Sequence, residues 1–133
     1  MASYLLDTNH ASPLVTLHHP LRQRVLLAQQ AGHEFAICVP VLNELWYGIS
    51  LLPRAAQNRA EWLRLRQTIT CYVPDESDGM DAAELRVQLR RGGQQLALVD
   101  SLIAILAVRY QLILLTEDGD FQNIPRLQVE NWL

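Results

Sequence analysis

Acidic residues lie in apolar surroundings at four places along this chain. Asp7 directly follows the run YLL, Glu44 lies within PVLNELWYGI, and Asp100 lies within LALVDSLIAIL. Asp118 and Asp120 come shortly after the run LILLT. Because an ionised carboxylate is costly to bury alone, each of these acids needs a partner. The arginines lie mostly on other segments, so we expect the acids to partner one another through a cation.

Carboxylates grouped in this way would have a definite chemistry. They repel one another, which raises their pKa values unless a cation is present. A set of oxygen donors without His or Cys favours Mg²⁺ or Mn²⁺. Such ions bind a scissile phosphate, lower the pKa of an attacking water and stabilise the leaving oxygen, so the pattern indicates hydrolytic phosphoryl transfer. Two simpler explanations stay open, namely that Asp100 is a helix N-cap and that Asp7 forms a turn.

The composition excludes several other enzyme classes. The chain has 133 residues, eleven arginines and no lysine, which excludes a P-loop nucleotidase and a Schiff-base enzyme. A phosphatase with an aspartate nucleophile is also disfavoured, because Asn9 stands where its second aspartate is expected. The formal net charge of −3 argues against general nucleic-acid binding. If four of the fourteen acids hold divalent cations, ten remain against eleven arginines, and this objection loses its weight.

Neither the histidines nor the cysteines form a metal motif. The four histidines lack the spacing of a zinc site, so we expect structural or surface roles for them. Cys38 and Cys71 lie in apolar runs and are expected to be buried free thiols. The chain does not start with a signal-peptide pattern, and its most apolar stretch is interrupted by polar residues. We therefore expect a cytoplasmic protein without a membrane span.

Short apolar runs alternate with helical patterns along the chain. Strands are expected over residues 3–6, 35–39, 71–73, 112–115 and 128–130. Helices are expected over residues 21–31, 40–52, 54–70, 75–91 and 100–110. The acids that crowd the start of the 75–91 helix, and Glu61, are expected at the surface. The alternation predicts one α/β domain over residues 1–133, with a mostly parallel sheet flanked by helices.

The predicted sheet also gathers most of the unusual acids at one edge. The carboxyl ends of parallel strands share an edge, and ligand sites form beyond it. Asp7 ends the first strand, Asp118 and Asp120 follow the fourth, and Glu44 lies early in the helix after the second. Asp100 opens the helix that leads into the fourth strand, and we expect such a helix to run back from the opposite edge. A long or bent connection could bring Asp100 to the other acids, but the periodicity alone does not show this.

Four segments of the chain also carry a family resemblance. They are LLDTN (5–9), PVLNELWYG (40–48), LVDSLIAILA (98–107) and LLTEDGDF (114–121). Each segment alone is a weak signal, but together they have the order and spacing of a PIN domain. The chain resembles the VapC-type ribonuclease toxins of bacterial toxin–antitoxin pairs.

The resemblance implies a PIN-like sandwich in which Asp7, Glu44 and Asp100 meet in one acidic pocket. The fourth acid of this pocket would lie in the TEDGDF segment, where Asp118 is our first choice for that acid and Asp120 our second. By this resemblance Asp7 and Asp100 would bind the metal directly. Glu44 and Asp118 would be further ligands or would orient ordered water.

The same resemblance implies a wider set of properties. Thr8, Asn9 and Thr116 match polar positions that help to hold the site. The expected activity is Mg²⁺- or Mn²⁺-dependent cleavage of single-stranded RNA or tRNA by a homodimer that a cognate antitoxin inhibits. The alternative is a PIN-like protein that binds RNA or a protein partner without cleavage.

Two features of the sequence each allow more than one explanation. The predicted helix pair over residues 40–70 carries apolar residues beyond one face, including Trp46 and Tyr47, and these could contact an antitoxin, a second subunit or simply the core. Several arginines could contact substrate phosphates or form a solvated surface. They are Arg54, Arg59, Arg64, Arg86, Arg90 and Arg91.

Overall fold

A five-stranded parallel sheet forms the centre of the computed structural model, which describes residues 1–133. Its strands are β1 (Ser3–Leu6), β2 (Glu34–Cys38), β3 (Thr70–Tyr72), β4 (Ile113–Leu115) and β5 (Val129–Glu130). Their order in the sheet is β3-β2-β1-β4-β5, and every neighbouring pair is parallel. The order reverses direction at β1, so the crevice beside its carboxyl end is the place where such sheets bind ligands.

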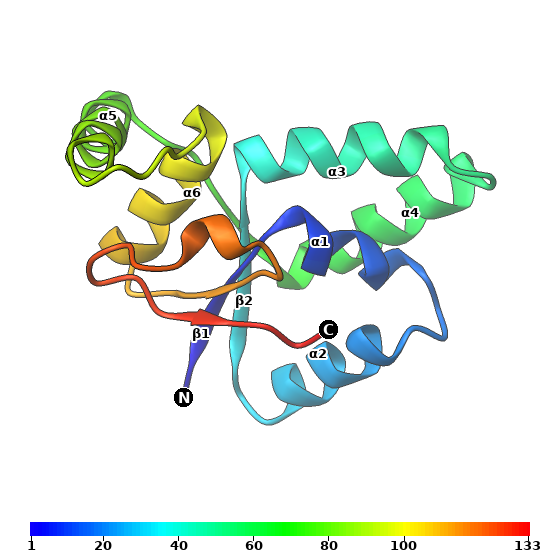
Figure 1. Ribbon diagram of the computed structural model, residues 1–133. Coiled ribbons are helices and arrows are strands. Elements are labelled where there is room, and N and C mark those ends of the chain that lie inside the picture. Colours follow the sequence, from blue (N-terminus) through cyan, green and yellow to red (C-terminus); the bar gives the residue numbers. More distant parts are fainter.

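Helices connect the strands and cover both faces of the sheet. They are α1 (Thr8–Ala11), α2 (Pro20–Gln30), α3 (Val39–Leu51), α4 (Ala55–Leu65), α5 (Glu76–Arg91) and α6 (Leu98–Arg109), with short 3-10 helices η1 (Ser12–Val15), η2 (Arg66–Thr68) and η3 (Gly119–Phe121). Figure 1 shows α5 and α6 on one side of the sheet, and α1, α2 and α4 on the other. No helix combines the length and the apolar character needed to cross a bilayer.

The central strands are buried on both faces, which explains why they appear in the sequence as continuous apolar runs. Leu5 and Leu6 of β1 and Leu114 and Leu115 of β4 are all 0% exposed. Each such side chain contributes about 1.5–3 kcal/mol by leaving water. Side chains that directly follow this β1–β4 pair are therefore attached to a rigid part of the sheet.

The expected α/β fold is confirmed, with corrections at several elements. The segment after β1 forms α1 and η1, which the sequence did not predict, because they are too short for a helical periodicity. The helix expected over residues 54–70 ends at Leu65, and a 3-10 turn follows. The last long helix begins at Leu98 and its N-cap is Ala97, so Asp100 lies in the first helical turn and is not the cap.

The direction of α6 settles where Asp100 lies relative to the sheet. After α6 ends at Arg109, the chain turns through Gln111, whose φ is 56°, and enters the amino end of β4. The helix therefore runs antiparallel to the strand that follows it, and it begins at the carboxyl edge of the sheet. Asp100 needs no unusual connection to reach the other acids.

Two acids that were expected at the surface have structural partners instead. Asp78 is 1% exposed, and its carboxylate accepts hydrogen bonds from Arg109 Nη1 at 2.8 Å. Asp78 also forms a reciprocal capping box with Asp75 at the start of α5. Glu61 on α4 pairs with the buried Arg22 of α2, with Nη1 and Oε1 2.7 Å apart. These acids are neutralised by arginine and are separate from the acids at the sheet edge.

The histidines and cysteines mostly behave as expected. His10, His19 and His33 each accept a hydrogen bond from a backbone amide, which agrees with structural roles. Both cysteines are free. Cys38 is buried as expected, whereas Cys71 on the edge strand β3 is only half-buried.

Candidate active site

Asp7 is the most firmly held acid at the carboxyl edge of the sheet. Its backbone amide continues the β1–β4 ladder by donating to Leu115 O at 3.0 Å, and its side chain caps α1. Oδ1 accepts from Thr8 N at 2.8 Å, and Oδ2 accepts from Thr116 Oγ1 at 2.7 Å. These bonds fix the orientation of a carboxylate that is only 7% exposed.

The electrostatic environment of Asp7 opposes its ionisation. Burial raises the pKa of the Asp7 carboxyl, and the nearby charges of Glu44 and Asp118 raise it further. The hydrogen bonds from Thr116 and Thr8 act in the opposite direction but do not cancel the effect. Asp7 is therefore a buried acid without a cationic partner.

A hydrogen-bonded chain behind Asp7 links it to the C-terminal segment. Asn9 Nδ2 donates to Asp7 Oδ2 and to Thr116 Oγ1, both at 3.3 Å. Asn9 Oδ1 lies 2.6 Å from Nδ1 of His10, which is 0% exposed. Because His10 Nε2 accepts from Trp132 N at 3.0 Å, the proton of the neutral ring is on Nδ1 and points to Asn9. This link could not be predicted from the sequence, since its two ends are more than a hundred residues apart.

Burial also explains the charge state of this histidine. It lowers the pKa of His10 to about 4, with a smaller contribution from Arg24. The ring is therefore neutral at physiological pH and can donate to Asn9 while accepting from Trp132. Its neutral form holds Asn9, and through Asn9 it supports Asp7.

Glu44 joins the site from the other side. It lies in α3, directly after β2, and its side chain is exposed. Thr8 Oγ1 donates to Glu44 Oε2 at 2.8 Å, which ties the first turn of α1 to α3. The two polar residues that follow β1, Thr8 and Asn9, therefore each hold one acid of the site.

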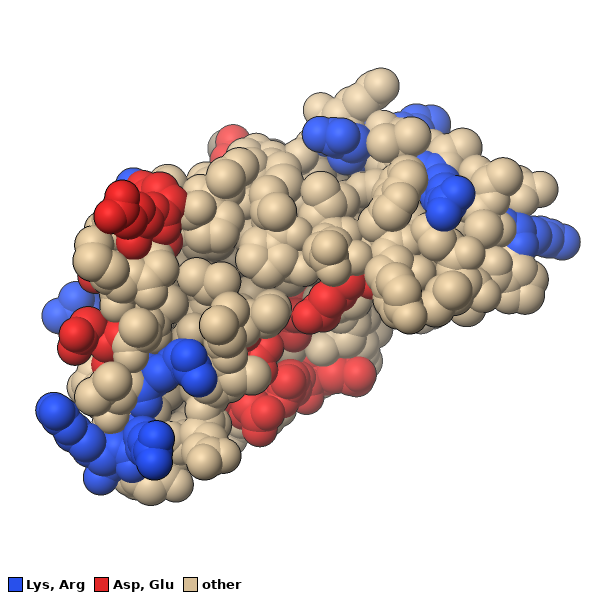
Figure 2. Space-filling model, turned by 90° about the horizontal axis from the view of Figure 1, so that it is seen from above, with Lys and Arg blue, Asp and Glu red and all other residues tan.

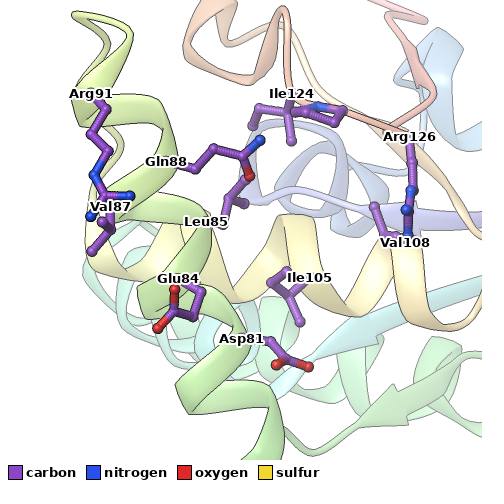
Figure 3. A pocket seen from close by; sticks show the side chains of 11 residues that line it. Asp81, Glu84, Leu85, Val87, Gln88, Arg91, Ile105, Val108, Ile124 and Arg126 are labelled. Carbon is purple, nitrogen blue, oxygen red and sulfur yellow. The ribbon is translucent and has the colours of Figure 1, made fainter.

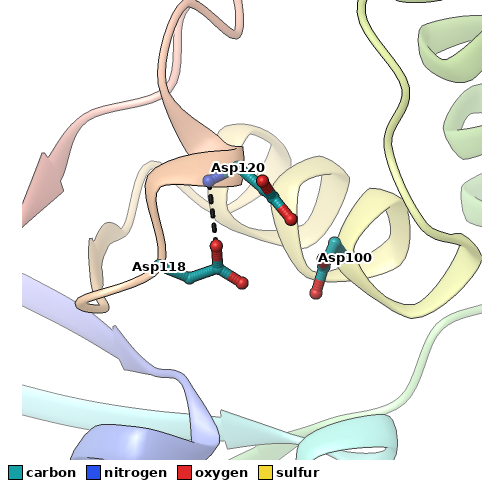
Figure 4. Close-up of side chains that lie close together, drawn as sticks. All are labelled: Asp100, Asp118 and Asp120. Atoms are coloured by element: carbon teal, nitrogen blue, oxygen red, sulfur yellow. Dashed lines mark hydrogen bonds between the residues drawn. The ribbon is translucent and has the colours of Figure 1, made fainter.

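Asp100, Asp118 and Asp120 form the tightest group of acids. Each offers a carboxylate oxygen within 4.8 Å of those offered by the other two. Figure 4 shows Asp100 on α6 facing the two loop acids, with Asp118 Oδ1 accepting from Asp120 N at 2.9 Å. Asp118 N donates to Thr116 Oγ1 at 3.0 Å, which connects this loop to Asp7. Asp118 is half-buried and Asp120 is exposed, and both reach Asp100.

Asp100 has the clearest electrostatic perturbation of the group. Burial and the neighbouring acids raise its pKa to about 6. The acids that contribute are, in decreasing order, Asp118, Asp7, Asp120 and Glu44, so all the other predicted acids act on Asp100. No arginine forms an ion pair with any of them. A bound cation would relieve this repulsion without protonation of the acids, and a donor set made only of carboxylates suits a hard divalent cation.

A hollow on another part of the molecule lacks this chemistry. The hollow drawn in Figure 3, of about 390 Å³, lies between α5, α6 and the loop after η3. Its charged residues are Asp81, Glu84, Arg91 and Arg126, so both signs are present, and none of the predicted site residues lines it. The acids at the sheet edge thus remain the candidate centre.

Comparison with families of known proteins agrees with this geometry. The model of the PIN domain matches residues 4–127. The chain belongs to the PIN-domain family. This PIN domain is 32% identical over 101 residues to ribonuclease VapC4 of Mycobacterium tuberculosis, covering 74% of this chain and 78% of the relative. It is 28% identical over 130 residues to ribonuclease VapC2 of Rickettsia felis, covering 97% of each chain.

Solved structures show the same PIN fold. VapBC2 from Rickettsia felis, in a crystal with a DNA fragment from its promoter, matches 98% of this chain and 99% of its own chain, with a TM-score of 0.84 and 27% identity. DNA-bound VapBC from Salmonella typhimurium matches the whole of both chains, with a TM-score of 0.81 and 24% identity. The expected PIN-like sandwich is therefore confirmed.

Proposed function

We propose that this PIN domain is a metal-dependent endoribonuclease that hydrolyses RNA phosphodiester bonds. One observation carries the proposal, namely that Asp100, Asp118 and Asp120 gather at the carboxyl edge of the sheet, within reach of the charges of Asp7 and Glu44, and that none of these acids has an arginine partner. The similarity to the ribonucleases VapC4 and VapC2 supports RNA as the substrate. Single-stranded RNA or tRNA is the substrate class that we propose.

The acids have distinct proposed roles. Asp7 and Asp100 are the direct ligands of Mg²⁺ or Mn²⁺, and Glu44 and Asp118 are further ligands or orient water. Asp120 shares the group around Asp100 and is the second choice for the loop acid. When bound, the metal supplies Lewis-acid activation of a water and charge stabilisation at the phosphate.

The polar residues around the acids position them. Thr116 and Asn9 hold Oδ2 of Asp7, and Thr8 holds Glu44. Thr116 also accepts from the amide of Asp118, so one hydroxyl group orients both a strand-end acid and a loop acid. Preorganisation of this kind keeps the carboxylates aimed at one point despite their repulsion.

We further propose that the protein is the toxin of a toxin–antitoxin pair, acting in the cytoplasm as a homodimer until its cognate antitoxin binds. The VapBC structures that share its fold support this role. The outer face of α3 supplies exposed apolar surface for a protein partner, since Tyr47 and Leu51 are both 69% exposed. Growth arrest on expression, relieved by a protein encoded in the neighbouring reading frame, would test the toxin role.

The activity is tested by incubating the purified protein with single-stranded RNA and Mg²⁺ or Mn²⁺. We expect cleavage by the wild type, loss of cleavage in EDTA, recovery on adding the metal back, and loss of cleavage in Asp7→Asn. Full activity of Asp7→Asn, or activity in EDTA, would contradict the metal mechanism. Binding of RNA without cleavage under all these conditions would favour the alternative, a PIN domain that only binds.

A further inference from the structure

A second hollow opens directly beside the acid group, because Asp120 lines it as well. It has a volume of about 670 Å³ and lies between α5 and the connection from α5 to α6. Its charged residues are Arg86, Arg90 and Asp120, and its remaining side chains are apolar or amides. Two arginines therefore stand next to the acids without neutralising them.

No acid neutralises the charge of either arginine. Of the eleven arginines, three pair with acids and one donates to a hydroxyl group through its guanidinium. They are Arg22, Arg59, Arg64 and Arg109. Arg86 uses only Nε, which donates to Leu96 O at 3.2 Å, so both of its terminal amino groups stay available. The guanidinium group of Arg90 has no hydrogen-bonding partner and no acid within ion-pair distance.

The walls of the hollow are held in place by the chain itself. The bond from Arg86 to Leu96 O ties α5 to the connection that follows it. Gln94 Nε2 donates to Asp120 O at 3.4 Å and to Gln122 O at 3.2 Å, which ties that connection to the loop of Asp118 and Asp120. The position of Arg86 relative to the acids is thus set before any ligand binds, which lowers the entropic cost of binding.

The opposite side of the acid group has the opposite charge. The hollow there, of about 490 Å³, is lined by Glu117, Asp118 and Glu130 and contains no arginine. Figure 2, which looks down on the carboxyl edge of the sheet, shows acidic side chains along the middle of this face, basic ones at the right, and both basic and acidic ones at the left. A polyanion that reaches the acids is repelled on one side and attracted on the other.

We propose that Arg86 and Arg90 bind the backbone phosphates of the nucleotides next to the scissile bond of single-stranded RNA. This inference rests on the proposed ribonuclease function. Arginine donors suit phosphate oxygens, and the hollow has no aromatic side chain on which a base could stack. The subsite therefore contributes affinity and direction to the RNA and does not select its sequence.

The test measures binding separately from cleavage. A fluorescently labelled single-stranded RNA is titrated with protein in Ca²⁺, and the integrity of the RNA is checked on a gel. We expect the double variant Arg86→Gln with Arg90→Gln to weaken the affinity about tenfold. The slope of log Kd against log salt should fall by about 1.4, because each phosphate contact on a single strand contributes about 0.7.

A matched control uses two other arginines with free charges near α5. Arg91 and Arg126 line the hollow of Figure 3, away from the acids, so Arg91→Gln with Arg126→Gln makes the same change in net charge. We expect less than a twofold effect from this control. Equal loss in both double variants, no loss in either, or no RNA binding by the wild type would overturn the proposal. If the wild type binds RNA through Arg86 and Arg90 but cleaves nothing, only the ribonuclease function fails.

Discussion

Two groups of carboxylates in this molecule have similar densities of charge but opposite surroundings. At the start of α5, Asp75 and Asp78 are paired with Arg109, and the Asp78 amide and Arg109 lower the pKa of Asp75. At the carboxyl edge of the sheet, Asp100 has acids as neighbours and no arginine, and burial and these neighbours raise its pKa to about 6. The first group is neutralised by arginine within the fold, whereas the second is the group for which we propose a cation.

The two groups should differ most in how RNA cleavage responds to the same substitution, Asp to Asn. Asp100→Asn removes a proposed metal ligand, so we expect RNA cleavage to fall about 100-fold or more. Its thermal stability should be equal to or above that of the wild type, because the change also removes repulsion. Single-turnover cleavage and thermal unfolding measure the two effects, and an active Asp100→Asn would remove Asp100 from the metal site.

The same chemical change at Asp78 should produce the reverse pattern. Asp78→Asn breaks charge-assisted hydrogen bonds with Arg109 in a side chain that is 1% exposed, so the free energy of unfolding should fall by about 1–3 kcal/mol. Cleavage by the folded variant should stay within about twofold of the wild type. Urea unfolding measures the loss. If the stability is unchanged, the ion pair with Arg109 is not structural.

The smallest expected effect is a pH-dependent difference in stability between the wild type and Asp100→Asn, measured without metal. The pKa of Asp100 in the folded state lies above its ordinary value, so the folded protein binds this proton more tightly, and its stability falls as the pH rises from about 4 to about 6. In EDTA at about pH 7.5, Asp100→Asn should unfold about 3 °C above the wild type, which corresponds to about 1 kcal/mol after allowance for solvent screening.

The comparison of Asp100→Asn with the wild type separates the effect of Asp100 from that of other residues that titrate in the same pH range. The buried His10 has a lowered pKa of about 4, so it stabilises the fold above its ordinary pKa and less as the pH falls from about 6.5 to 4. Both proteins share this effect. At about pH 5, midway between the ordinary pKa of Asp100 and its raised value, the difference between the two unfolding temperatures should be about half as large, and below about pH 4 it should shrink toward zero. A difference that does not change with pH would contradict the raised pKa.

The parts of the site that could be predicted from sequence are those that depend on local chain direction. Asp7 and Asp118 follow apolar strands directly, so their position at one edge of the sheet follows from the parallel alternation of elements. Asp100 could have been placed on the same argument, since a helix that precedes a parallel strand begins at the carboxyl edge. The family resemblance brought it into the acidic pocket independently.

The parts that could not be predicted depend on contacts between distant residues. Asp78 has the sequence context of a solvated helix start, and its burial depends on Arg109, which lies 31 residues further along. The support of Asp7 by His10 needs Trp132, which lies 122 residues from His10. The choice between Asp118 and Asp120 also stays undecided, because both reach Asp100.

The central claim is that the unpaired acids at the sheet edge hold a divalent cation. Titration of the protein with Mn²⁺, followed by calorimetry or by the electron paramagnetic resonance of the free ion, tests it directly. We predict saturable binding by the wild type and by Asp78→Asn, and an affinity at least about tenfold lower in Asp100→Asn. Equal Mn²⁺ affinity in the wild type and in Asp100→Asn, or no binding by either, would contradict the account.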